Sequence, residues 1–110
     1  MDNIQKQLMN KFLIDIKKLI SQGKFVFAGT RFKNIDFLKR YGLTIDDVKA
    51  VIFDLNTSNY KRGPTDDRNS KFEGMVWEFN YLLELSVDID IYIKIRYNPP
   101  NEIVCISFHD

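Results

Sequence analysis

The side chains of this chain that could do chemistry are acids, bases and cations, with one imidazole among them. His109 is the only histidine, and an unperturbed imidazole, with a pKa of about 6.5, suits proton transfer near neutral pH. The sequence contains no glycine-rich phosphate loop, no zinc-ligand spacing and no serine or cysteine nucleophile with a matched base. Cys105 and His109 are about 13 Å apart along a predicted strand, which argues against a catalytic pair. We therefore expect chemistry without a metal or another cofactor.

One reaction that needs only such groups is the cleavage of single-stranded RNA by its own 2′-hydroxyl group. Because the nucleophile belongs to the substrate, the protein supplies a base, an acid and cations for the charge that develops on the phosphate. Tyr60 and Tyr92 could stack on unpaired bases. The candidate phosphate-binding cations are Lys61, Arg62, Lys94 and Arg96. Periodicity alone favours a plainer interpretation, in which the row of Tyr92, Lys94 and Arg96 is the solvent-facing side of an antiparallel sheet.

Two strands near the end of the sequence would position these groups. Isoleucines alternate with polar residues from Ile89 to Ile95, which predicts a strand over 88–97 with one apolar face. Two consecutive prolines predict a turn over 98–101 and an antiparallel return strand over 103–109. His109 would then lie diagonal to Tyr92 on the polar face. The predicted pairs are Ile95 with Val104, Ile93 with Ile106, Ile91 with Phe108, Lys94 with Cys105, Tyr92 with Ser107 and Asp90 with His109.

The remaining segments predict an α+β fold, with three N-terminal helices followed by a mostly antiparallel sheet. Helices are expected over 3–22, over 31–41 and from Thr44 to Leu55, where apolar residues recur at three- and four-residue spacing. The first could instead lie on a membrane surface. Further strands are expected over 25–27 and 75–85. Residues 56–74 are polar and rich in turn residues, which is typical of a functional loop or of an ordinary solvated one.

Composition narrows the class of protein. A length of 110 residues, of which 45% are hydrophobic, predicts one domain over residues 1–110 with a real core. A net charge of +1 excludes a strongly basic protein that coats nucleic acid, although it allows a local basic cleft. One cysteine excludes an internal disulfide. Without a signal peptide or a long apolar run, we expect a cytoplasmic protein with no membrane partner.

Several short motifs, which occur in order over roughly residues 12–109, resemble the MqsR-type toxins. These toxins are the RNA-cleaving halves of bacterial type II toxin–antitoxin pairs. No single motif is diagnostic, whereas the ordered set is fairly specific. The matching pieces are Ile16-Lys-Lys-Leu-Ile20 with Gly23, Tyr41-Gly-Leu-Thr-Ile-Asp-Asp47, Val51-Ile-Phe-Asp-Leu55, Asn59-Tyr-Lys-Arg-Gly-Pro64 with Asp67, Gly74-Met-Val-Trp-Glu-Phe79, Ile91-Tyr-Ile-Lys-Ile95 and Cys105-Ile-Ser-Phe-His109.

This resemblance implies a RelE-like fold and a metal-independent endoribonuclease, or mRNA interferase, that a cognate antitoxin neutralises. By position, Lys61 matches the loop lysine of the family and Glu78 the polar residue after the tryptophan. Tyr92 matches the sheet tyrosine and His109 the basic residue near the C-terminus. Two departures stand out. Glu78 replaces a residue that is neutral in some relatives, and it would repel phosphate unless it acts as the base or pairs with a cation such as Lys94. His109 replaces a lysine of some relatives.

The implied reaction gives a 2′,3′-cyclic phosphate and a 5′-hydroxyl. In the expected scheme Glu78 takes the 2′-hydroxyl proton and His109 protonates the leaving oxygen, although these two roles could be reversed. Lys61 and Arg62 would stabilise the phosphate and Tyr92 would orient the substrate. The alternative is a non-catalytic protein on the same scaffold, which binds nucleic acid or a partner protein. A toxin that has lost its activity but still binds the antitoxin is a third possibility.

Overall fold

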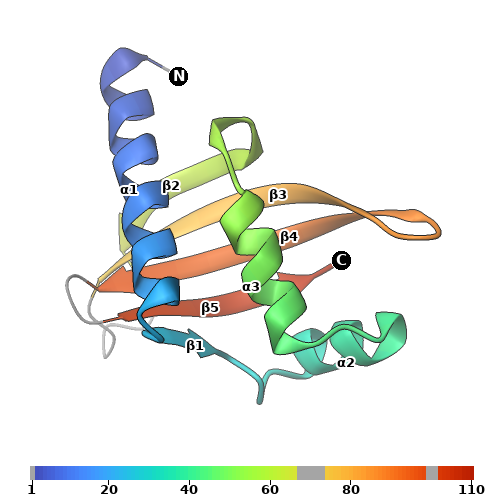
Figure 1. Cartoon of the computed structure of the whole chain (residues 1–110). Coiled ribbons are helices and arrows are strands. Elements are labelled where there is room, and N and C mark those ends of the chain that lie inside the picture. The colour runs from blue at the N-terminus through green and yellow to red at the C-terminus, as the bar shows by residue number, and fades with distance from the viewer. Residues whose placement is uncertain (1, 67–73, 99–101) are drawn as a thin grey trace.

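The computed structural model describes residues 2–66, 74–98 and 102–110, and in this part of the chain three α-helices accompany a five-stranded mixed sheet, four strands of which follow the last α-helix (Figure 1). The sheet order is β1-β5-β4-β3-β2, with β1 parallel to β5 and the other neighbours antiparallel. The predicted α+β class is therefore confirmed. The elements are α1 (Asn3–Ser21), β1 (Phe25–Phe27), α2 (Phe32–Tyr41), α3 (Ile45–Asp54), a 3-10 turn (Thr57–Asn59), β2 (Tyr60–Asp66), β3 (Met75–Glu84), β4 (Asp88–Asn98) and β5 (Glu102–His109).

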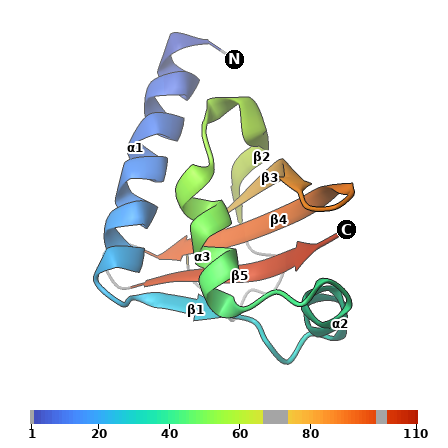
Figure 2. The same ribbon diagram turned by 45° about the vertical axis from the view of Figure 1, so that its right-hand side comes forward.

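The helices leave one face of the sheet open. Helices α1 and α3 lie over the same face, whereas α2 lies beside the far end of β5 (Figures 1 and 2). The apolar stripe of α1 packs on the sheet, where Phe12 stacks on Trp77 with ring centroids 4.3 Å apart. The packed interpretation of this helix is thus confirmed. Ile91, Ile93 and Ile95 are fully buried beneath the helices, so the alternation in β4 correctly predicted its core face.

Local sequence signals set the helix ends. Thr44 and Asp47 form the expected capping box, in which the Thr44 main-chain N–H donates to the Asp47 carboxylate at 2.7 Å and the Asp47 N–H donates to the Thr44 hydroxyl at 3.3 Å. At the start of α1, the Asp2 carboxylate accepts a hydrogen bond from the Gln5 N–H at 2.8 Å. Glycines follow α1 and α2 with positive φ, as helix-terminating residues often have.

The segment 56–74 differs from the prediction. Instead of one long loop it contains β2, an edge strand that pairs with β3 through two register irregularities; residues 67–73 lie outside the described residues, as do residues 99–101 of the predicted turn. Gly63 sits where a Cβ atom would lie 2.7 Å from the carbonyl oxygen of Val76, so only glycine fits. Glycine, proline and polar residues hide a strand from sequence reasoning, although an edge strand tolerates them.

The predicted register between the last two strands is wrong. Near the turn Ile95 lies opposite Cys105, and farther along Lys94 lies opposite Ser107, which leaves Ile106 as an extra residue in a β-bulge. Cys105 therefore faces the core, whereas the prediction placed it on the polar face. The bulge then returns Phe108 to the core and His109 to the open face. His109 lies directly opposite Tyr92 rather than opposite Asp90.

Candidate functional site

The open face of the sheet is hollowed into a cleft of about 520 Å³, which is bounded by the start of α2 and by strands β2 to β5. Four cationic side chains and two carboxylates line this cleft together with His109. Although the whole chain carries a net charge of only +1, its positive charge is locally concentrated here. The lining residues are Arg31, Lys33, Arg62, Thr65, Asp66, Val76, Glu78, Tyr92, Lys94, Ser107 and His109.

Glu78 lies in β3, between β2 and β4, and only 12% of its side chain is exposed. Its Oε1 atom accepts a hydrogen bond from the Tyr92 hydroxyl at 2.5 Å, and its Oε2 atom is 3.7 Å from Nε of Arg62. Lys94 is its neighbour across the strands on the other side. The sequence pointed to Lys94 as a cation that could offset this carboxylate, whereas the ion pair forms with Arg62. The negative charge of Glu78 is therefore partly compensated by the neighbouring Arg62 guanidinium.

Tyr92 joins the other candidate catalytic residues. The ammonium nitrogen of Lys61 lies 5.1 Å from the centre of the Tyr92 ring, which is a cation–π contact. The imidazole of His109 packs beside the same ring, with centroids 5.8 Å apart. The Tyr92 hydroxyl donates a hydrogen bond to the Glu78 carboxylate. The structure thus gathers Lys61, Glu78 and His109 around Tyr92, although Lys61 lies at the margin of the cleft.

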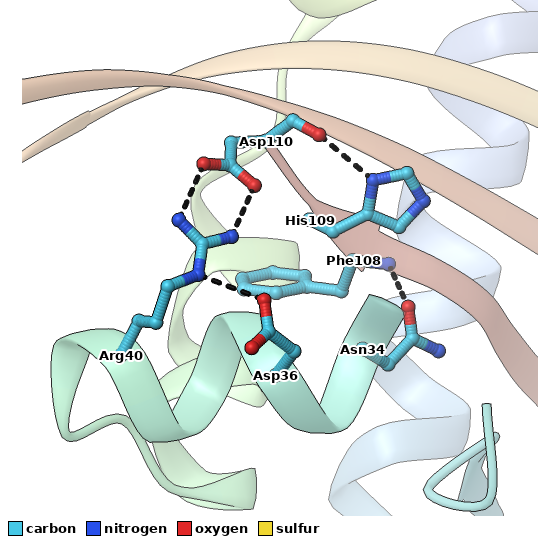
Figure 3. A network of polar contacts seen from close by, with 6 residues as sticks. All are labelled: Asn34, Asp36, Arg40, Phe108, His109 and Asp110. Atoms are coloured by element: carbon cyan, nitrogen blue, oxygen red, sulfur yellow. Dashed lines mark hydrogen bonds and ion pairs between the residues drawn. The ribbon is translucent and has the colours of Figure 1, made fainter. Parts of the chain in front are cut away.

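The orientation of the His109 ring is defined by its Nδ1 atom, which lies 3.0 Å from the main-chain oxygen of Asp110 (Figure 3). A main-chain oxygen can only accept, so the contact is a hydrogen bond when Nδ1 carries the hydrogen. Nε2 is then the ring nitrogen that remains for exchanging a proton with a substrate.

Two predicted RNA-binding residues do not line the cleft. Tyr60 points to the helix-covered face, where it packs edge-on against Trp77 at 6.4 Å and donates its hydroxyl to the carbonyl oxygen of Gly63 at 2.6 Å. Arg96 lies opposite Val76 and Val104, farther along β4 than the lining residues. Of the four candidate cations, Arg62 and Lys94 line the cleft.

Sequence reasoning missed two cations, Arg31 and Lys33, which line the cleft from the start of α2. Their charge and their position at a helix start are visible in the sequence. What the sequence lacks is the packing of α2 against β5, which carries both side chains to the cleft. No long-range signal in the sequence links this helix to the strand.

The described residues, 2–66, 74–98 and 102–110, contain neither a metal-ligand cluster nor a membrane-spanning helix. No group of three or more histidine, cysteine, aspartate and glutamate residues in these parts of the chain could hold a metal ion. Within the same residues, no helix is long and apolar enough to cross a membrane.

The fold and the cleft define a small α+β protein with titratable and cationic groups gathered on the open face of its sheet. The family model described as "Motility quorum-sensing regulator, toxin of MqsA" matches residues 10–110. The chain therefore belongs to the MqsR toxin family, and it is a toxin of a toxin–antitoxin system. No curated protein and no solved structure matches the chain.

Proposed function

We propose that this toxin is an endoribonuclease that cleaves mRNA in the cleft on the open face of the sheet. The observation that carries the proposal is the convergence of Glu78, Tyr92 and His109 beside several cations in one cleft. These groups supply a base, an acid and charge stabilisation, which are sufficient when the substrate brings its own nucleophile. The scheme therefore needs no metal.

Different cations bind different parts of the RNA backbone in this proposal. Arg62 and Lys94 flank Glu78 on the floor of the cleft. Arg31 and Lys33, at the start of α2, form the wall of the cleft on the side of that helix. Lys61, which rests on the ring of Tyr92, completes the set near the reacting phosphate. Such charge-assisted contacts to phosphate oxygens give affinity without sequence preference. We expect affinity for RNA to fall as the salt concentration rises.

In this proposal the two titratable groups of the cleft, Glu78 and His109, carry out the proton transfers. Glu78 acts as the base, and His109 acts through Nε2 as the acid that protonates the leaving 5′-oxygen. In the reverse assignment, Nε2 of His109 is the base and the Glu78 carboxyl is the acid. Oε1 of Glu78 already accepts from Tyr92, whereas Oε2 is 3.7 Å from Arg62 and is the less engaged oxygen. We therefore assign the 2′-hydroxyl proton to Oε2. The products are a 2′,3′-cyclic phosphate and a 5′-hydroxyl.

Membership of a toxin family supports two further parts of the proposal. The toxin acts in the cytoplasm, where its mRNA substrate is found. A cognate antitoxin neutralises it by binding. Induced expression in bacteria without the antitoxin should arrest growth and degrade mRNA, whereas a non-catalytic binding protein would be tolerated.

The decisive experiment uses purified protein and RNA in excess EDTA. We expect cleavage, with ends that are a cyclic phosphate and a 5′-hydroxyl, and we expect none when the nucleotide at the mapped cleavage position is 2′-deoxy. His109→Gln and Glu78→Gln should each reduce the rate by about 10²- to 10⁴-fold, as for the loss of a general acid or base. Full activity in both variants would refute the assignment.

A matched pair on α2 tests the binding part separately. Lys33 lines the cleft, whereas Lys39 lies on the same helix away from it. Lys33→Gln should weaken RNA binding by up to about tenfold and reduce its salt dependence, because one phosphate contact is lost. Lys39→Gln has the same charge change and should bind RNA like the unmodified protein. Equal effects of the two substitutions would show that the wall next to α2 does not bind the substrate.

A further inference from the structure

Among the residues that the structure describes, no strand pairs with the far end of β5 on its outer side. The pairing of β1 with β5 ends at Phe27 and Cys105, and β1 is the outermost strand of the sheet. Beyond it, the Ala28 N–H donates to the Cys105 carbonyl oxygen at 3.0 Å. The next outward-facing main-chain groups belong to Ile106 and Phe108, and buried main-chain groups need partners.

The Asn34 side chain supplies a partner to both of these groups, and Nη1 of Arg31 also donates to the carbonyl oxygen of Ile106 at 3.4 Å. Asn34 of α2, only 1% exposed, donates from Nδ2 to the carbonyl oxygens of Ile106 at 2.9 Å and Ala28 at 3.0 Å. Its Oδ1 atom accepts from the Phe108 N–H at 3.0 Å (Figure 3). Because two of the partners are carbonyl oxygens and the third is an N–H group, the nitrogen and the oxygen of the Asn34 amide are unambiguously assigned. The Asn34 amide therefore pairs with β5 as a neighbouring strand would.

The same helix also holds the residue after His109. The Arg40 guanidinium binds the Asp110 carboxylate through two hydrogen bonds, at 2.9 and 2.6 Å, while Asp36 holds Nε of Arg40 at 2.8 Å (Figure 3). The main-chain oxygen of Asp110 is the group that contacts Nδ1 of His109. Both sequence neighbours of His109 are thus attached to α2, one through Asn34 and the other through Arg40.

We propose that Asn34 is a positioning residue for His109, with the Arg40–Asp110 ion pair as a second support. By holding the Phe108 main chain on one side of His109 and the Asp110 side chain on the other, α2 keeps Nδ1 on the Asp110 oxygen and presents Nε2 to the cleft. The catalytic consequence rests on the proposed function. The tautomer of the ring does not, because it follows from the hydrogen bonds alone.

The sole histidine makes the test direct, since every imidazole signal in a ¹⁵N NMR spectrum belongs to His109. We expect neutral His109 in the unmodified protein to carry its hydrogen on Nδ1. Asn34→Ala, which removes all three hydrogen bonds, should shift the ring toward the mixture of tautomers of an unrestrained imidazole. In RNA cleavage the same variant should lose about tenfold or more in kcat with little change in KM, because the reacting group is misplaced while the phosphate contacts remain.

A variant of similar cost to stability separates positioning from general destabilisation. Val48→Ala removes two methyl groups from a fully buried position in α3, away from His109. It should leave the His109 tautomer and kcat unchanged. A folded Asn34→Ala protein with the original tautomer and the original kcat would overturn the proposal. If the protein cleaves no RNA at all, the proposed function fails, and the NMR result still decides the role of Asn34.

Arg40→Gln is the arm that remains if Asn34→Ala does not fold. The substitution removes the second support at an exposed position and leaves Asn34 in place. A shift of the His109 tautomer toward the unrestrained mixture would support the proposal. A spectrum identical to that of the unmodified protein would overturn it.

Discussion

The two halves of β5 are held in different ways. The first half runs from Glu102 to Cys105; Ile103 to Cys105 lie between β4 and β1 and are held by main-chain pairing on both sides, and Glu102 pairs with β4. From Ser107 to His109 the strand keeps β4 on one side, while the other side is held by the amide of Asn34. The bulge at Ile106 separates the halves. Main-chain pairing between strands does not depend on the identity of the side chains, whereas the second half of β5 depends on the side chain of Asn34.

The two halves of β5 also differ in where their side chains lie. The first half of β5 buries Ile103 and Cys105 completely and contributes to the core. The second half carries His109 to the open face, after the bulge has changed which residues point outward. β-bulges commonly redirect a side chain next to a functional site. The first half should therefore govern stability and the second half activity, and the following changes test this division.

Ile103→Ala should give the largest effect on stability. The side chain is fully buried, so its truncation should lower the free energy of unfolding by about 2–5 kcal/mol, as for comparable core positions. The rate of RNA cleavage per folded molecule should not change, since His109 lies on the other side of the bulge. Urea unfolding at low temperature and single-turnover cleavage measure the two quantities.

The matched control for this prediction is Glu102→Ala, an exposed change in the same half of the strand, which should leave both quantities nearly unaltered. A loss of cleavage rate in folded Ile103→Ala protein would show that the two halves of β5 are not separable.

The reactivity of Cys105 sharpens the same comparison. Burial raises the pKa of this thiol well above its usual range, so the reactive thiolate is scarce in the folded protein. Alkylation at pH 8 should be at least about a hundredfold slower in the folded protein than in urea, because it requires opening of the core. An exposed thiol at the end of α1, made by Ser21→Cys in a Cys105→Ala background, should react at nearly the same rate with and without urea. Rapid alkylation of native Cys105 would mean that the first half of β5 opens easily.

The smallest effect concerns the ion pair that supports the second half. The hydrogen bonds from Arg40 hold the pKa of the Asp110 carboxyl below its usual value of about 4. A lowered pKa in the folded state stabilises the protein above the ordinary aspartate pKa, and this contribution is lost as the pH falls through the lowered value. Both side chains are more than a third exposed, so the gain is small.

The measurement for this last prediction is the midpoint of urea unfolding as a function of pH. The difference between the unmodified protein and Arg40→Gln should be present at pH 6 and should vanish toward pH 2, when Asp110 is protonated in both. A difference that persists unchanged at pH 2 would mean that Arg40 stabilises the protein by its contacts with Phe37 and Tyr41 instead of with Asp110.

By itself the sequence determined the elements whose signals are local. The spacing of apolar residues in α1, the capping box at Thr44 and the alternation of isoleucines in β4 each depend on a few neighbouring residues, and the structure confirms all three. It also singled out Tyr92 and His109, to which the family resemblance added Glu78, and the structure brings these three residues together.

Only the tertiary structure decided how these elements fit together. Residues 103–106 read Ile-Val-Cys-Ile, and four apolar residues in a row do not show which of them face the core. The register of β5 was therefore set by its partners: β4 on one side, β1 and Asn34 on the other. The packing of α2 beside β5, which brings Arg31 and Lys33 to the cleft, escaped the sequence for the same physical reason, whereas the edge strand β2 was hidden by its glycine, proline and polar residues. A pairing register or a helix packed beside a strand belongs to two distant segments at once, and neither segment encodes it alone.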